Sequence, residues 1–286
     1  MPQLNPLIRL SFTLFFLLSA GFTQAEVIDI STEADTRYQQ MMGERELVFY
    51  AIDLASNQHY TYNLDAAEKR ETPFSTFKIP NLIIALETGV TTLDQRRAWD
   101  ANKRPASSFW PETWKKEMAL AEAFRRSAVW YFQDLAVEVG GERYRAALNE
   151  FNYGNAQVPD GSDDFWLNGE LAISPKEQAL FLQGLLSGDL PVNTTTLDAL
   201  YTVSLLDQQP GYRLHGKTGA GPVVPGQFDG EFAGWLAGWV KPDNAAPVVF
   251  ALHVKGPGFS AINQFRRQMS EQLLQLIGAL PPESTR

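Results

Sequence analysis

Cysteine is absent from this chain of 286 residues. Its absence excludes disulfide bonds, thiolate nucleophiles and cysteine-ligated zinc, although it does not exclude an oxidising compartment. Histidine is scarce as well: His59, His215 and His253 are the three in the chain, and they lie far apart in the sequence. Because imidazole and thiolate are the main ligands of transition metals, we expect no metal site.

An excess of basic residues is also lacking. The chain has 24 Lys and Arg against 33 Asp and Glu, which gives a net charge of −9. Binding to nucleic acid or to an anionic membrane surface depends on positive charge, so we expect neither partner. The hydrophobic share of 44% and the charged share of 20% are ordinary for a globular protein. The length suits one large domain or two closely packed lobes.

Only the N-terminus carries a long apolar run. Arg9 precedes LSFTLFFLLSAGF at 10–22, which is too short to span a bilayer comfortably, and the small residues of TQA offer cleavage near Ala25. This pattern predicts a secretory signal peptide over residues 1–25, with a retained membrane anchor as the alternative. Cleavage removes one positive charge and no acid, so the mature chain carries −10.

Strand patterns occur near both ends of the mature chain, and helical patterns occur between them. Alternating apolar runs predict a hairpin at 46–54 and 59–64 and three strands at 212–219, 232–240 and 247–254. Helical spacing of apolar residues marks 112–140, 142–152, 174–188 and 262–280.

This order predicts an α+β fold. One antiparallel sheet is built from both termini and flanked by helices, and an all-helical lobe is inserted between its strands. The domain at 26–286 then divides into a mixed α/β lobe, about 26–80 and 198–286, and a helical lobe, about 81–197.

Ser75 and Lys78 lie three residues apart, just ahead of a long apolar run. The run predicts a helix to about Thr88, with Gly89 as its stop and Pro80 tolerated near its start. A spacing of three puts both side chains on one helical face. Burial lowers the pKa of a lysine, about 10.4 in water, by roughly 3–5 units. A neutral amine can accept the serine proton or add carbon dioxide to form a carbamate base.

Two further motifs distinguish this pair from a chance match. A Ser-x-x-Lys pair arises roughly once in any chain of this length. The tripeptides KTG at 217–219 and YGN at 153–155 are expected only about 0.1 and about 0.02 times by chance. Their joint presence in this order is therefore informative.

With these motifs the chain resembles the class D, oxacillinase-type, serine β-lactamases. The matching segments cover nearly the whole mature chain; they are STFKIPNLIIALETG at 75–89, SAVWYFQ at 127–133, YGN, FWLNGEL at 165–171, HGKTG at 215–219 and GWLAGWV at 234–240. KTG alone also fits penicillin-binding proteins and other serine β-lactamases. The resemblance implies a serine β-lactamase/DD-peptidase-like fold, hydrolysis of a β-lactam substrate and a periplasmic location. Monomer and homodimer both stay open.

The resemblance also implies catalytic roles. Ser75 would attack the lactam carbonyl and become acylated. Lys78, carboxylated on its amine with carbon dioxide or bicarbonate and needing no other cofactor, would be the base for acylation and for deacylation. Trp166 would donate its indole N–H to the carbamate. Ser127 would pass the proton to the lactam nitrogen, and Lys217 would attract the substrate carboxylate and tune Ser127.

A second implied set binds the substrate. Backbone N–H groups of Ser75 and Ala220 would form the oxyanion hole, and Val129 would line the wall beside the lysine. Gly219 would let the substrate lie against its strand. Thr218 would hold the carboxylate together with an arginine of the last helix. The full set is Val129, Thr218, Gly219, Ala220 and Arg266, where Arg266 fits the family's register better than Arg267.

Four alternatives stay open at this point. DFWLN at 164–168 is similar to the loop with which class A β-lactamases position water, so Asp164 is a rival base. His215, on the same strand face as Lys217, permits a Ser–His pair, although a strand histidine at a cleft rim is the plainer interpretation. The fold also serves β-lactam sensors, which stay acylated, and penicillin-binding transpeptidases or carboxypeptidases, which act on cell-wall peptides.

Overall fold

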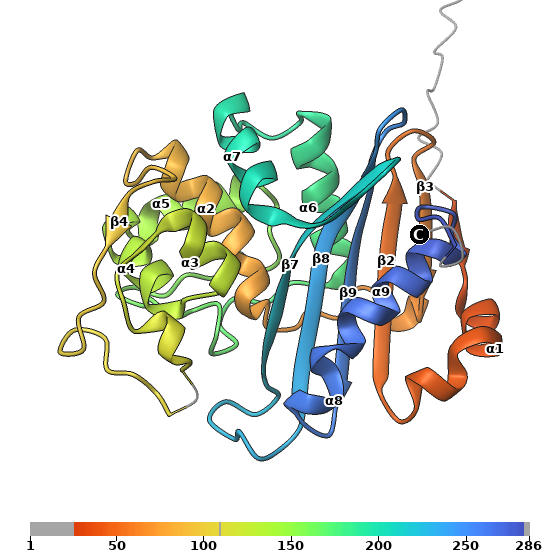
Figure 1. Cartoon of the computed structure of the whole chain (residues 1–286), viewed down its shortest axis with the longest axis horizontal. Coiled ribbons are helices and arrows are strands. Elements are labelled where there is room, and N and C mark those ends of the chain that lie inside the picture. Colours follow the sequence, from red (N-terminus) through yellow and green to blue (C-terminus); the bar gives the residue numbers. More distant parts are fainter. Residues whose placement is uncertain (1–25, 109, 283–286) are drawn as a thin grey trace, which may run out of the picture.

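The structure, a computed structural model, describes residues 26–108 and 110–282. Its centre is a seven-stranded sheet of order β1-β3-β2-β9-β8-β7-β6 (Figure 1). The strands are β1 (Val27–Asp29), β2 (Glu46–Asp53), β3 (Gln58–Tyr62), β6 (Leu205–Gln209), β7 (Tyr212–Pro222), β8 (Phe232–Pro242) and β9 (Val248–Gly256). The hairpin and the three later strands predicted from the sequence are confirmed, as is a sheet assembled from both ends of the chain. The predicted signal peptide lies outside the described residues.

One strand pair departs from the antiparallel prediction. β1 runs parallel to β3, with Val27 opposite His59, while the remaining neighbours in this sheet are antiparallel. The helix α1 (Ser31–Met42) separates β1 from β2 and reverses the chain between them. Because both α1 and β2 lie between β1 and β3 in the sequence, the chain has the long connection that a parallel pair requires.

The two faces of the sheet are covered by different helices. On β9, Phe250, Leu252 and Val254 pack toward α1 and the C-terminal helices, whereas Val249 and Ala251 pack toward the helical lobe. In Figure 1, α8 (Phe259–Asn263) and α9 (Phe265–Leu276) lie across one face. The helices of the other side are α2 (Lys78–Glu87), α3 (Leu120–Arg126), α4 (Val129–Val139), α5 (Gly141–Glu150), α6 (Pro175–Ser187) and α7 (Thr194–Ser204).

The start of α6 follows the sequence prediction. Ser174 is the N-cap and Pro175 the first helical residue. The Ser174 hydroxyl accepts the N–H of Glu177 at 3.1 Å, and the Glu177 carboxylate accepts the N–H of Ser174 at 2.9 Å. This capping box satisfies two backbone donors and contributes about 1 kcal/mol.

The helical prediction for 112–140 is wrong in its continuity. The segment contains a 3₁₀ turn η3 (Glu112–Trp114) and a short strand β5 (Met118–Ala119), which pairs with β4 (Arg96–Arg97), before α3 and α4. The two helices are separated at Ser127, whose φ of 60° is left-handed. The apolar spacing continues through this break because both helices bury the same side. The last predicted helix is also divided, at Gln264, into α8 and α9, although the backbone of Gln264 stays in the right-handed helical region.

Candidate active site

The serine and the lysine of the first motif lie where a 3₁₀ turn passes into a helix. Ser75 is in the turn η2 (Phe74–Phe77), and Lys78 is the first residue of α2. Lys78 Nζ is hydrogen-bonded to Ser75 Oγ at 3.0 Å. The lysine is 0% exposed, and the ring of Phe132 lies 5.0 Å from its Nζ. Burial, followed by the charge of Lys217, lowers the pKa of Lys78 well below its ordinary value.

Trp166 is buried directly behind this turn. Its ring stacks on Phe77 with centroids 5.3 Å apart, and its backbone carbonyl accepts the N–H of Phe74 at 3.1 Å. Within the part of the chain that the structure describes, the indole Nε1 has no hydrogen-bond partner. A buried donor left without an acceptor costs about 1–3 kcal/mol, so this N–H is available to an anion beside it.

Ser127 and Lys217 form a second pair. Lys217 of β7 donates to Ser127 Oγ at 2.5 Å and to the carbonyl of Thr218 at 3.0 Å. The left-handed backbone at Ser127 turns its side chain toward the sheet instead of along α3. Burial first, and then the nearby Arg266, lowers the pKa of Lys217 to about 7. An anion bound beside it would raise that pKa again.

The structure explains the glycine at position 219 differently from the way we expected. A Cβ at this position would lie 2.8 Å from the carbonyl oxygen of Pro73 and 3.1 Å from the backbone nitrogens of Ser75 and Thr76. The missing side chain therefore makes room for the η2 backbone, whereas we expected it to make room for substrate. This close approach brings the backbone at Ser75 and the edge of β7 near Ala220 together.

The two arginines of the last helix differ in their surroundings. Arg266 is 8% exposed and lines the main cavity, where it donates to the carbonyl of Gly219 at 2.9 Å and to Asn263 Oδ1 at 3.0 Å. Burial lowers its pKa to about 10, so it keeps its charge at neutral pH. Arg267 instead forms an ion pair with Glu271 and is partly exposed.

A cavity of about 680 Å³ joins these groups. Ser75, Ser127, Val129 and the strand residues Thr218, Gly219 and Ala220 line it, together with Asp164. Lys78, Trp166 and Lys217 lie beneath its surface, at 0%, 0% and 5% exposure. Sequence reasoning missed its aromatic wall, whose side chains come from separate loops and elements; they are Trp110, Trp114, Phe228, Phe232 and Phe259.

His215 does not take part in this cavity. Its ring stacks on Trp239 with centroids 5.1 Å apart, and its Nδ1 pairs with the hydroxyl of Ser204 at 3.2 Å. At 3% exposure it is a buried residue of the core rather than a histidine of a cleft rim, and burial lowers its pKa to about 4. The Ser–His alternative for Ser75 therefore has no geometric support.

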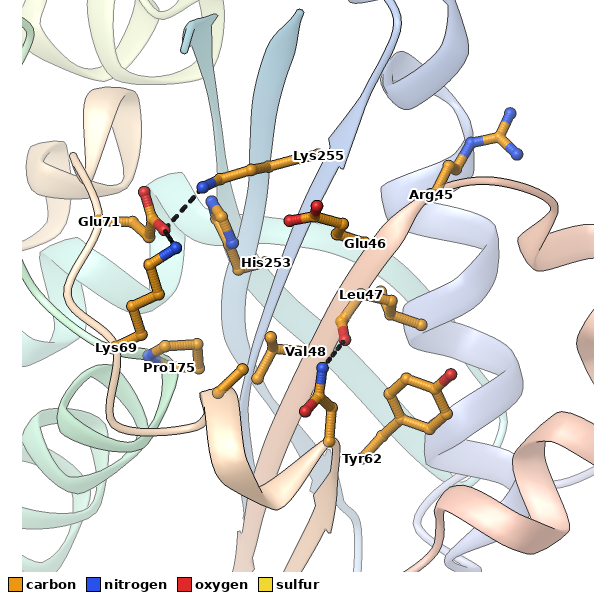
Figure 2. A pocket seen from close by; sticks show the side chains of 12 residues that line it. Arg45, Glu46, Leu47, Val48, Tyr62, Lys69, Glu71, Pro175, His253 and Lys255 are labelled. Atoms are coloured by element: carbon orange, nitrogen blue, oxygen red, sulfur yellow. Dashed lines mark hydrogen bonds and ion pairs between the residues drawn. The ribbon is translucent and has the colours of Figure 1, made fainter.

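A smaller cavity of about 230 Å³ is lined by Lys69 and Glu71, shortly before Ser75 in the sequence, and by His253 and Lys255 of β9 (Figure 2). There Glu71 accepts from Lys255 at 2.8 Å and pairs with Lys69 at 3.2 Å. His253 packs against Trp235 with ring centroids 4.4 Å apart and the rings tilted by 51°, and Trp235 Nε1 donates to the carbonyl of Thr72 at 2.9 Å. These contacts fix the segment 71–74 against β8 and β9, and so fix the start of the turn that carries the serine.

Within the described ranges, no group of three or more histidine, aspartate or glutamate side chains is arranged to hold a metal ion. None of the helices in those ranges combines the length and the apolar character that a bilayer crossing requires.

Comparison with known proteins adds family evidence. The family model described as "Penicillin binding protein transpeptidase domain" matches residues 31–275. The β-lactamase OXA-20 of Pseudomonas aeruginosa is 30% identical over 96% of this chain and 98% of its own length. The "Probable beta-lactamase YbxI" of Bacillus subtilis is 37% identical over 60% of this chain, an alignment that spans 62% of that relative.

Two solved structures are similar over most of the chain. The class D β-lactamase YbXI from Nostoc has a TM-score of 0.76 and 29% identity, covering 85% of this chain and 98% of its own. The C-terminal domain of the Bacillus licheniformis BlaR penicillin receptor has a TM-score of 0.78 and 26% identity, covering 90% and 98%.

Proposed function

Because the chain belongs to the class D β-lactamases, we propose that it hydrolyses the amide bond of β-lactams through an acyl-enzyme on Ser75, with carboxylated Lys78 as the base. The observation that carries the proposal is the dry Lys78 amine, bonded to the hydroxyl of Ser75 at 3.0 Å. An amine held neutral by burial can add carbon dioxide, releasing one proton, and the product is an anionic oxygen base.

The surroundings of Lys78 fit such a carbamate. The ring of Phe132 lies 5.0 Å from Lys78 Nζ, and Phe77, next to Lys78 in the sequence, is fully buried and stacks on the fully buried Trp166, so these neighbours are apolar. The Trp166 indole N–H has no acceptor among the described residues and adds no charge. The carbamate supplies a proton acceptor, and the protein supplies a dry site and one donor.

Acylation then follows from the side chains in the cavity. Lys78 takes the proton of Ser75 Oγ, which attacks the lactam carbonyl, and the backbone N–H groups of Ser75 and Ala220 stabilise the developing oxyanion. Each such donor is commonly worth about 2.7–4 kcal/mol. Lys217 donates to Ser127, so the Ser127 hydroxyl can give its own proton to the departing lactam nitrogen. Arg266 and Thr218 hold the substrate carboxylate at the cavity edge.

Deacylation uses the same base a second time. Lys78 deprotonates a water that attacks the acyl ester, and the proton returns to Ser75 Oγ as it leaves. Asp164 also lines the cavity, where it accepts from Ser162 and Asn168, each at 3.3 Å. These contacts give Asp164 a structural task in its loop, and we assign the deacylating base to Lys78.

Steady-state hydrolysis of a small β-lactam panel, with and without added bicarbonate, tests this function. We expect multiple turnovers of penicillins, and at acid pH we expect a rate that recovers when bicarbonate is added. The likeness to the BlaR domain makes a sensor the second candidate. A single burst without turnover would favour that sensor, and hydrolysis of a D-Ala-D-Ala peptide would favour a cell-wall peptidase. Export to the periplasm, followed by removal of the signal peptide, is part of the proposal.

A further inference from the structure

Phe74, the residue before the nucleophile, adopts an unusual backbone conformation. Its φ is 49°, in the left-handed region that bulky side chains rarely occupy. Conformations of this kind persist only where the surrounding structure holds them, and they gather at functional sites. Phe74 is 5% exposed and lines the main cavity. The strained residue therefore lies at the site itself.

The ring of Phe74 covers the face of Gly221 on β7. A Cβ built at Gly221 would lie 2.1 Å from Cε1 and 2.5 Å from Cδ1 of that ring. The ring packs in one cluster with Ala233 and Trp235, against Leu167 and Val223. It is thus held between two strands and the loop that carries Trp166, and it occupies the volume that a side chain at position 221 would need.

This ring borders the path of the substrate's acyl group. β6 pairs with β7 only from Tyr212 to His215, and the continuation of β7 at 218–222 lines the cavity. In the proposed binding mode, the lactam nitrogen lies beside Ser127 and the lactam carbonyl lies at Ala220. The acyl group is attached on the other side of the lactam carbonyl, so it runs toward Gly221. We call the space between Phe74, Leu167 and residues 220–222 the acyl slot.

We propose that Phe74 is a specificity-determining residue that closes the end of the acyl slot over Gly221. Phe74 thereby limits the enzyme's substrates to β-lactams whose acyl group is narrow next to the carbonyl of its own side-chain amide. The proposal rests on the β-lactamase function proposed above. It also explains why position 221 requires glycine, since any side chain there would push the ring into the slot.

The test compares two penicillins on each enzyme preparation. In methicillin the acyl carbonyl is bonded to a phenyl ring that carries two methoxy groups at the neighbouring ring positions. In benzylpenicillin the acyl carbonyl is bonded to a methylene group. The ratio of their kcat/KM values is independent of the folded fraction, so a loss of stability cannot imitate a change in specificity. We expect Phe74→Ala to raise the methicillin-to-benzylpenicillin ratio by about 10-fold or more, because steric fit in an apolar slot discriminates by such factors. Phe74→Leu should give an intermediate ratio.

Two further variants test the contact between the Phe74 ring and position 221. Gly221→Ala should lose activity on both penicillins relative to 6-aminopenicillanic acid, which has no acyl group. Phe74→Ala combined with Gly221→Ala should recover it, because the 2.1 Å overlap is gone. Val137→Ala is the control: it shortens a side chain on α4 that is 58% exposed and is not among the residues that line the cavity, and it should leave the ratio within about twofold.

An unchanged methicillin-to-benzylpenicillin ratio in Phe74→Ala, or a double variant no better than Gly221→Ala, would overturn the proposal. Wild-type protein that hydrolyses none of the three compounds would instead refute the proposed function. The two failures are therefore distinct.

Discussion

Lys78→Ala is expected to reduce kcat/KM for benzylpenicillin by about 10⁴-fold. A positioned general base contributes about 10²–10⁴-fold to a step, and kcat/KM reports acylation, for which this lysine is the proposed base. The substitution removes the group bonded to Ser75 Oγ at 3.0 Å and leaves an apolar space beside the ring of Phe132. Ser75→Ala should be equally inactive.

The combination of these two changes separates a shared mechanism from independent contributions. Residues that act as one unit are not additive, so Ser75→Ala with Lys78→Ala should be no slower than either single variant. Lys176→Ala, which removes a lysine paired with Glu68 at the surface, is the control and should stay within about twofold of wild type. A Lys78→Ala enzyme that retains a tenth of the wild-type rate would exclude the lysine as the base.

Trp166→Phe is expected to slow deacylation by about 10–100-fold. Phenylalanine keeps the stacking on Phe77 but removes the indole N–H, and a hydrogen bond to a charged group is worth about 1.5–3 kcal/mol. Loss of this hydrogen bond destabilises the carbamate, and we expect the rate of deacylation, the step in which water is activated, to fall more than the rate of acylation. The acyl-enzyme should therefore accumulate. The measurement is a pre-steady-state burst with a slow following rate, and excess bicarbonate should restore part of that rate.

Asp164→Asn serves as the matched variant in the same loop. It keeps the size of the side chain and removes its charge, and we expect deacylation within about threefold of wild type. If Asp164→Asn accumulates acyl-enzyme while Trp166→Phe does not, Asp164 is the base and the carbamate account is wrong.

The sequence predicts the elements whose apolar pattern is strong. β8 and β9 are buried over nearly their whole length, and their apolar patterns were sufficient to predict both strands. The unpredicted elements have weak patterns: α1 buries only Ala34 and Met42, and β6 is exposed or half-buried throughout. The strands β4 and β5 have two residues each, which is too short for any periodic signal.

The same distinction holds for the site. The motif around Ser75 and Lys78 is local, and its helix and apolar neighbours can be read from adjacent residues. The turn at Ser127 depends on Lys217 of β7, and the conformation of Phe74 depends on Gly221 and Trp166, all distant in the sequence. No local pattern encodes these pairs, so the acyl slot could not be predicted from the sequence.

The carbamate at Lys78 is most directly measured by carbon-13 NMR of wild-type protein equilibrated with ¹³C-bicarbonate. Burial favours the neutral amine by lowering the pKa of Lys78, so the carbamate should form at neutral pH and be lost as acid protonates the amine. We expect one carbamate carbon signal at neutral pH that is absent in Lys78→Ala, disappears on acidification and returns on neutralisation. Protein that hydrolyses benzylpenicillin at neutral pH while giving no such signal would contradict the account.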